Sequence, residues 1–249
     1  MDHNTFIELD QLKAKLDAHR PLDAGLVARL RENLVLDWTY NSNAIEGNTL
    51  TLQETRVVLE GVTIGGKNIR EHLEAINHRD AIVYVESWVQ KEEPFTEHAI
   101  RNLHHLVLKG IDEANAGRYR TVNVKIGGAK HVPPECLNVP SLMAEFVEWH
   151  NALAMTMHAI ERAARVHVDF VGIHPFVDGN GRTSRLLMNL ELMKAGFPPV
   201  VIPVERRLEY YQTLDCAHTT HDYQPFIRFV CECVKASFEP YLFALGIKA

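Results

Sequence analysis

One stretch, from His174 to Arg185, constrains this chain more than any other, and it reads H-P-F-V-D-G-N-G-R-T-S-R. Gly179 and Gly181 flank Asn180 and leave the backbone free to turn sharply and to direct several N–H groups at one point. The residues from Arg182 onward are good helix formers, so the turn is expected to begin a helix. A glycine-rich turn at a helix N-terminus binds anions, because its N–H groups are unpaired and the dipole is positive there. The sequence therefore predicts a phosphate-binding loop.

Four side chains of this stretch add the chemistry of phosphate transfer. Arg182 and Arg185 lie three residues apart, so both can point at the same anion. His174 has an ordinary pKa near neutrality and could take a proton from an attacking hydroxyl. Asp178 could hold Mg²⁺ against the phosphates, or it could only cap the helix. Arg182 is also consistent with a solvated helix face, so the residues alone leave these last two roles open.

The stretch is similar to the signature of the Fic-domain proteins, H-x-F-x-D/E-G-N-G-R-x-x-R, and every defining position is filled. The resemblance extends over residues 40 to 235. It includes residues 42–48, S-N-A-I-E-G-N, which resemble the family's inhibitory-helix motif S/T-x-x-x-E-G/N. It implies a mainly α fold: a Fic-type helical domain with one small β-hairpin flap and an N-terminal inhibitory helix.

The resemblance also implies an activity, the transfer of AMP from ATP to a hydroxyl side chain (Ser, Thr or Tyr) of a target protein. Pyrophosphate is released. In this scheme His174 deprotonates the hydroxyl, Asp178 binds Mg²⁺ and Phe176 anchors the loop in the core. The nucleotide- and phosphate-binding residues that the family implies are Gly179, Asn180, Gly181, Arg182, Arg185, Tyr210 and Tyr211.

A second role is implied for the motif around Glu46, which begins at Ser42. In the family the matching glutamate pairs with the second arginine of the signature, here Arg185. That pair would occupy donors that the γ-phosphate of ATP needs, so transfer would be inhibited within the chain. Some relatives use the same glutamate to orient a water that removes AMP from the modified target. Removal of AMP is therefore an alternative activity.

The segment from Thr121 to Val132 is the one strand signal in the chain. Residues 121–126 alternate apolar and polar side chains, and a Gly-Gly turn follows them, which predicts a small β-hairpin. It resembles the family's flap, which pairs with the target segment through backbone hydrogen bonds. His218 stands where close relatives have asparagine near the adenine. The flap residues implied are Val124, Lys125, Ile126, Gly127 and Gly128.

Apolar residues recur at helical spacing through most of the chain. Leu26, Leu30, Leu34 and Trp38 predict a long helix up to about Ala44, and a short helix precedes it. We divide the chain into an N-terminal helical arm, residues 1–60, and a catalytic domain, residues 61–249. Thr51 and Glu54 form a capping box that opens a helix ending at Gly61. Further helices are predicted over residues 68–90, 96–109, 141–154, 159–172, 181–195, 205–218 and 223–243.

Composition and charge narrow the remaining choices of function and cellular location. A net charge of −6 argues against a general nucleic-acid binder, and no basic recognition helix follows the domain. The four cysteines have neither zinc-site nor disulfide-framework spacing, no signal peptide is apparent, and no apolar run is long enough to span a membrane. We therefore expect a cytoplasmic protein, and the resemblance implies ATP and a target protein as its partners. A homodimer, which relatives often form, is left open. Transfer of another phosphate-containing group and a non-catalytic nucleotide- or partner-binding module stay open.

Overall fold

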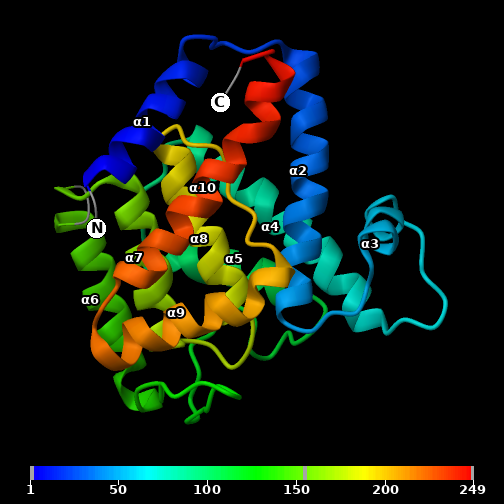
Figure 1. The fold of residues 1–249 in the computed structure, drawn as a ribbon. Coiled ribbons are helices and arrows are strands. Elements are labelled where there is room, and N and C mark those ends of the chain that lie inside the picture. Colours follow the sequence, from blue (N-terminus) through cyan, green and yellow to red (C-terminus); the bar gives the residue numbers. More distant parts are fainter. Residues whose placement is uncertain (1–2, 154–155, 248–249) are drawn as a thin grey trace.

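The computed structural model describes residues 3–153 and 156–247, and its described residues are built from helices (Figure 1). The prediction of a mainly α fold is confirmed. In chain order the helices are α1 (His3–Asp17), α2 (Ala24–Ile45), α3 (Leu52–Leu59), α4 (Ile69–Gln90), α5 (Glu97–Leu108), α6 (Val139–Ala152), α7 (Ala159–Ile173), α8 (Asn180–Lys194), α9 (Arg207–Thr220) and α10 (Gln224–Ala244), with the 3₁₀ turns η1 (Cys136–Asn138) before α6 and η3 (Val204–Arg206) before α9.

The helix ends follow local capping chemistry. Thr51 and Glu54 form the predicted capping box of α3, with side-chain to backbone bonds of 3.2 and 2.8 Å. Asn68 and Glu71 form a second box at the start of α4. The chain leaves α2 at Gly47, whose φ of +96° needs a residue without a Cβ. The end of α2 matters for function, because it fixes the position of the last turn of that helix.

Helix α8 occupies the middle of the fold, with α10 passing in front of it in Figure 1. Its residues 182–192 are buried on every face, which is typical of a helix enclosed by others. Met188 belongs to the apolar cluster formed with α1, α7, α9 and α10, whereas Leu187 belongs to the cluster formed with α4, α5, α6 and α7. Helix α8 is therefore packed into both apolar clusters, and it holds in place the loop that precedes it.

The predicted β-hairpin is wrong, because none of the described residues forms a strand. The turn itself exists, since the Ala129 N–H donates to Ile126 O at 3.3 Å. The arms beside it do not pair. The Lys130 N–H donates to the Asp215 carboxylate of α9 at 3.1 Å, and Arg120 binds the carbonyls of Val122 and Pro134. An isolated two-stranded hairpin is marginal in water, and contacts with side chains from elsewhere replace its ladder in this segment, the flap loop (residues 121–134).

No helix within the described ranges has both the length and the hydropathy to cross a membrane.

Candidate active site

The catalytic loop begins where α7 ends, at His174. The backbone of His174 is left-handed (φ 50°, ψ 58°), and a proline follows it, which disfavours the right-handed helical region. Its Nδ1 lies 3.3 Å from Val171 O. That contact assigns the ring proton to Nδ1 and leaves Nε2 as the acceptor of the neutral imidazole.

The surroundings of His174 keep its imidazole neutral. Burial lowers the pKa of His174 to about 4, and the charge of Arg120 acts in the same direction. The bond to Val171 and the charge of Glu46 oppose this shift without cancelling it. At neutral pH the ring is therefore unprotonated at Nε2, the form that a general base needs.

The interior of the loop is fixed by Phe176 and Asn180. The Phe176 ring is fully buried, as expected of a core anchor. Asn180 accepts the Phe176 N–H at 3.0 Å and donates to Phe176 O at 2.9 Å. The Asn180 side chain therefore braces the loop from within, and only its backbone N–H is available to an anion.

Three successive backbone donors stand at the start of α8. Within the described part of the chain no acceptor pairs with the N–H groups of Asn180, Gly181 and Arg182. Gly179, at φ +76°, turns the chain into the helix, and its own N–H donates to Asp178 Oδ1 at 2.6 Å. The predicted anion-binding turn is thus formed, with the positive end of the α8 dipole behind it.

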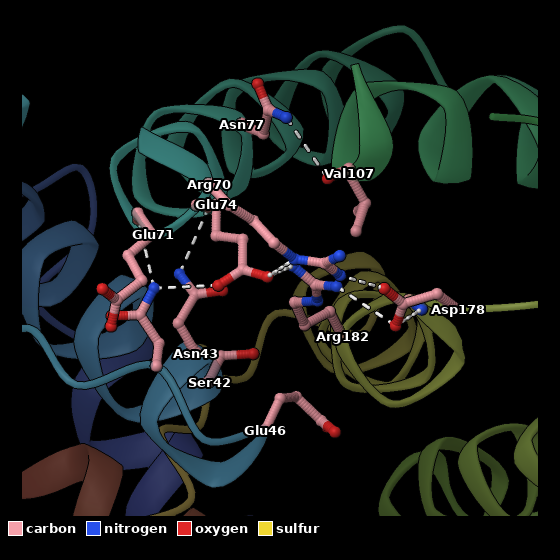
Figure 2. Close-up of polar contacts among 12 residues, drawn as sticks. Ser42, Asn43, Glu46, Arg70, Glu71, Glu74, Asn77, Val107, Asp178 and Arg182 are labelled. Carbon is pink, nitrogen blue, oxygen red and sulfur yellow. Dashed lines mark hydrogen bonds and ion pairs between the residues drawn. The ribbon is translucent and has the colours of Figure 1, made fainter. Parts of the chain in front are cut away.

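Asp178 stands at the α4 side of this turn, between two arginines (Figure 2). Its Oδ2 accepts from Arg70 Nη2, and its Oδ1 lies 3.5 Å from Arg182 Nη2. Burial raises the pKa of Asp178, but Arg182, the Gly179 N–H and Arg70 outweigh it, so the pKa lies below its ordinary value. The carboxylate is ionised at neutral pH.

His104 supports the same loop, although no motif in the sequence indicates a role for it at the site. It is fully buried on α5, donates from Nε2 to Asp178 O at 2.8 Å and accepts the Gly117 N–H at Nδ1. Its ring stacks on Phe176 with centroids 3.5 Å apart. The available signal was a polar residue on the apolar face of α5. Its partners could not be inferred from spacing.

Arg120 was missed altogether. Its Nε donates to His174 O at 2.8 Å, and its other nitrogens bind the carbonyls of Val122 and Pro134. One guanidinium thus ties both ends of the flap loop to the backbone carbonyl of His174. The residue lies at a distance of 54 positions from His174 in the sequence, and no local pattern marks it.

The predicted partners Glu46, Ser42 and Arg185 meet at one point. Glu46 Oε1 accepts from Arg185 Nη2 at 2.8 Å, and Ser42 accepts from the same guanidinium at Oγ (3.0 Å) and at its carbonyl (2.8 Å). Arg185 is only 2% exposed, whereas the Glu46 side chain is 35% exposed. Burial lowers the pKa of Arg185, but Tyr210 and Glu46 outweigh it and the pKa is raised. A Cβ at Gly181 would collide with Glu46 Oε1, so the carboxylate touches the anion-binding turn.

The two predicted tyrosines of α9 have different surroundings. The buried Tyr210 hydroxyl lies 3.3 Å from Arg185 Nη1 and 3.0 Å from His167 Nε2, and burial raises its pKa to about 12. Tyr211 is partly exposed and donates to Ile45 O at 3.1 Å. Both brace the last turn of α2 and its partner arginine in this structure.

A cavity of about 500 Å³ opens beside the turn, between the ends of α2 and α7, the flap loop and α9. Its volume suits a nucleotide-sized ligand. His218 contributes to it with Nε2 on Val168 O at 2.9 Å and its ring beside His131. Val124 belongs to the flap loop without lining the cavity. The predicted residues in the wall are Glu46, Lys125, Ile126, Gly127, Gly128, His174, Gly181, Tyr210 and Tyr211.

A metal ion here would depend on Asp178. Among the described residues, no group of three or more His, Cys, Asp or Glu side chains could hold a metal by itself. Mg²⁺ is commonly bound by one or two carboxylates together with substrate phosphates. The ionised, 43% exposed Asp178 beside three free N–H groups fits that arrangement.

The structure thus describes a helical protein in which a turn able to bind an anion, at the start of the central helix, lies beside an unprotonated histidine and a ligand-sized cavity. Residues 94–192 match the Fic/DOC family, and the chain belongs to that family.

Individual relatives agree with this assignment. The chain is 39% identical over 246 residues to "Protein adenylyltransferase Fic" of Drosophila grimshawi, covering 98% of this chain and 50% of the relative. The chain thus spans about half the length of the curated relatives it matches. Among solved structures, Fic-1 from C. elegans superposes with a TM-score of 0.90 at 37% identity, covering 98% of this chain and 73% of the other. A Fic-domain signalling protein from Bacteroides thetaiotaomicron gives 0.88 at 30% identity, with 96% and 97% covered.

Proposed function

We propose that this chain is a protein adenylyltransferase, which moves AMP from ATP to a hydroxyl side chain of a target protein. One observation carries the proposal: His174, whose neutral ring keeps Nε2 unprotonated, lines the same cavity as Gly181, and the turn that contains Gly181 has three N–H groups without an acceptor among the described residues. Binding alone does not require a base at that point. The adenylyltransferase name of the curated relatives supports the same activity.

The proposed step balances on the groups present. As the hydroxyl oxygen attacks the α-phosphorus, His174 Nε2 takes the hydroxyl proton. The bond from the α-phosphorus to the bridging oxygen breaks, and pyrophosphate leaves. The N–H groups of Asn180, Gly181 and Arg182 stabilise charge on the phosphate oxygens. Mg²⁺ held by Asp178 would supply further neutralisation of the phosphates when it is bound.

The flap loop is the proposed docking site for the target. It lies at the cavity wall, and most of its backbone is not paired with other segments, so an extended peptide can add to it. Val122 and Val132 expose 55% and 70% of their surface on this loop and offer apolar contact beside the backbone. We expect such docking to depend weakly on target sequence.

Glu46 is proposed to restrain the reaction. Its carboxylate occupies Arg185 Nη2, a donor that a terminal phosphate of ATP would use, and it stands against Gly181. An anion cannot share that position with a second anion without strong repulsion. ATP would therefore bind poorly, or with its α-phosphate displaced from His174, until the last turn of α2 moves.

The test compares the wild-type chain with Glu46→Gly, using Mg²⁺ and ATP labelled on the α-phosphate, and follows label onto protein. We expect strong labelling of Glu46→Gly, weak labelling of the wild type, and none of a Glu46→Gly, His174→Ala variant. Labelling that survives loss of His174 would remove it as the base. Equal labelling of wild type and Glu46→Gly would show that Glu46 does not restrain the reaction, while the adenylyltransferase assignment would stand. No label with any variant, on itself or on a cell extract, would overturn the adenylyltransferase assignment.

Removal of AMP is a second candidate function, favoured by the unpaired oxygen of Glu46. Only Oε1 binds Arg185; within the described residues Oε2 has no partner, and Glu46 lines the same cavity as His174. A carboxylate so placed can orient a water at a phosphate ester. Release of AMP from a modified protein by wild type but not by Glu46→Gln would support it, and equal release by both would exclude it.

A further inference from the structure

Positive charge already covers the carboxylate that is proposed to bind the metal. Asp178 Oδ2 accepts from Arg70 Nη2, while Oδ1 accepts the Gly179 N–H and lies 3.5 Å from Arg182 (Figure 2). These donors use three of the roughly four acceptor positions of the carboxylate, and a divalent cation at Oδ2 would stand against the positive charge of Arg70. A metal ion that binds Asp178 must therefore displace a donor that already contacts this carboxylate.

The two arginines differ in whether they can move away from Asp178. Arg182 is 2% exposed and enclosed by the fold, so it stays beside Asp178 whatever binds there. Arg70 is 52% exposed, and Asp178 is 43% exposed on that side. A half-exposed ion pair of this kind is held by about 1 kcal/mol or less, so Arg70 can swing into water at small cost.

Arg70 is nevertheless built into place by Glu74, one turn along α4. Glu74 Oε1 accepts from Arg70 Nε at 3.1 Å, so Glu74 holds one nitrogen of the guanidinium while another, Nη2, reaches Asp178. Glu74 is itself fixed: its Oε2 accepts from Asn48 Nδ2 at 2.9 Å, and its carbonyl accepts from Asn43 Nδ2 at 3.3 Å. Arg70 is thus a cation tethered at a set distance from Asp178.

We propose that Arg70 competes with the divalent cation for Asp178, so that the enzyme binds its metal more weakly than the carboxylate alone would. The proposal rests on the metal role of Asp178 in the proposed function. It adds a second restraint beside the Glu46–Arg185 pair. Arg70 must release Oδ2 before a cation can use it, and the Glu74 contact keeps the guanidinium close enough to return.

The test is Mn²⁺ binding, followed by the loss of the free-ion EPR signal, on the wild-type chain and three variants. Arg70→Gln removes the tethered cation. Lys67→Gln is the matched control, because it removes one positive charge three residues away, where the amine contacts Thr49 and Glu54 and not Asp178. Asp178→Asn reports whether the bound ion sits at this carboxylate. Circular dichroism checks that each variant folds.

We expect Arg70→Gln to bind Mn²⁺ about three- to fivefold more tightly than wild type, which corresponds to the loss of one surface ion pair of about 1 kcal/mol or less. Lys67→Gln should stay within about twofold of wild type. No tightening in Arg70→Gln, or equal tightening in Lys67→Gln, overturns the competition, since only net charge would then matter. If Asp178→Asn loses Mn²⁺ binding while Arg70→Gln binds as wild type does, the competition is refuted but Asp178 remains the metal site. Binding that ignores Asp178→Asn refutes the metal site of the proposed function.

Discussion

The two halves of helix α8 both carry buried polar groups, but these groups are paired in opposite ways. Near the C-terminal end, Asn189 bonds both the N–H and the carbonyl of Val200, at 2.7 and 2.8 Å. In the same half Glu191 accepts from Arg162 Nε at 2.6 Å and from His150 Nε2 at 2.9 Å. At the N-terminal end, three backbone N–H groups lack acceptors within the described chain.

The difference separates stability from function along one helix. Burial raises the pKa of Glu191, but His150 and Arg162 outweigh it and lower the pKa, so the buried carboxylate is charged and matched by its partners. Arg185, equally buried, is matched only in part by the half-exposed Glu46. Buried polar groups with complete partners hold the fold together. The incomplete set at the N-terminal end, three backbone N–H groups without an acceptor among the described residues, is where the proposed function places a phosphate.

The largest effect is expected at the incomplete end, from His174→Asn. Asparagine tolerates the left-handed backbone at this position but offers no base. In the Glu46→Gly background we expect transfer of labelled AMP to fall about 10²- to 10⁴-fold. Thermal unfolding should change little, because the side chain makes a single bond, to Val171. A loss of activity that tracks a loss of folding would return His174 to a structural role.

The complete end is broken by Arg162→Met, which removes one partner of the buried Glu191. A charge left buried without its partner costs about 3–5 kcal/mol of unfolding free energy. Urea denaturation measures it. Arg31→Met is the matched control, since Arg31 forms a forked pair with Glu86 at the surface and should cost less than about 1 kcal/mol. Equal losses from both variants would contradict the distinction between the two ends.

The sequence predicts the positions of the helices better than the contacts between them. Caps such as Thr51–Glu54 and apolar spacing are local, so the helices were placed within a few residues of their observed ends. The signature likewise located the free N–H groups and the Glu46–Arg185 pair, through its resemblance to the family. The support by His104, Arg120 and Glu74 depends on which helices meet in space, and no spacing along the chain reveals it.

The hairpin shows the opposite failure. The alternation before Gly127-Gly128 is a genuine strand pattern, and the turn forms. A two-stranded ladder gains too little by itself to outweigh side chains that reach the same backbone. Arg120 and Asp215 are such side chains, and they come from outside the segment. Local pattern can therefore predict an extended segment without predicting its pairing.

A smaller effect is expected from Arg185→Lys in the Glu46→Gly background. Lysine keeps the charge but loses the fork that bonds Ser42 and that is proposed to bind the terminal phosphate. We expect the KM for ATP to rise about tenfold while kcat changes less, because the interaction is mainly one of binding. Arg207→Lys, in the cavity wall but without a hydrogen bond to Ser42, is the control. An unchanged KM in Arg185→Lys would argue against the phosphate role.

The smallest effect is the pH response of the incomplete end. The base must be unprotonated, and burial places the pKa of His174 at about 4, so the active form persists as pH falls until that value is reached. Between pH 7.5 and 5.5, single-turnover transfer by Glu46→Gly should change by less than about twofold, whereas a histidine of ordinary pKa would lose about tenfold. A rate that falls with a midpoint near 6.5 would show that His174 is solvated in the working enzyme. The incomplete end of α8 would then open to water far more than the complete end, and the contrast between them would extend from bonding to solvent access.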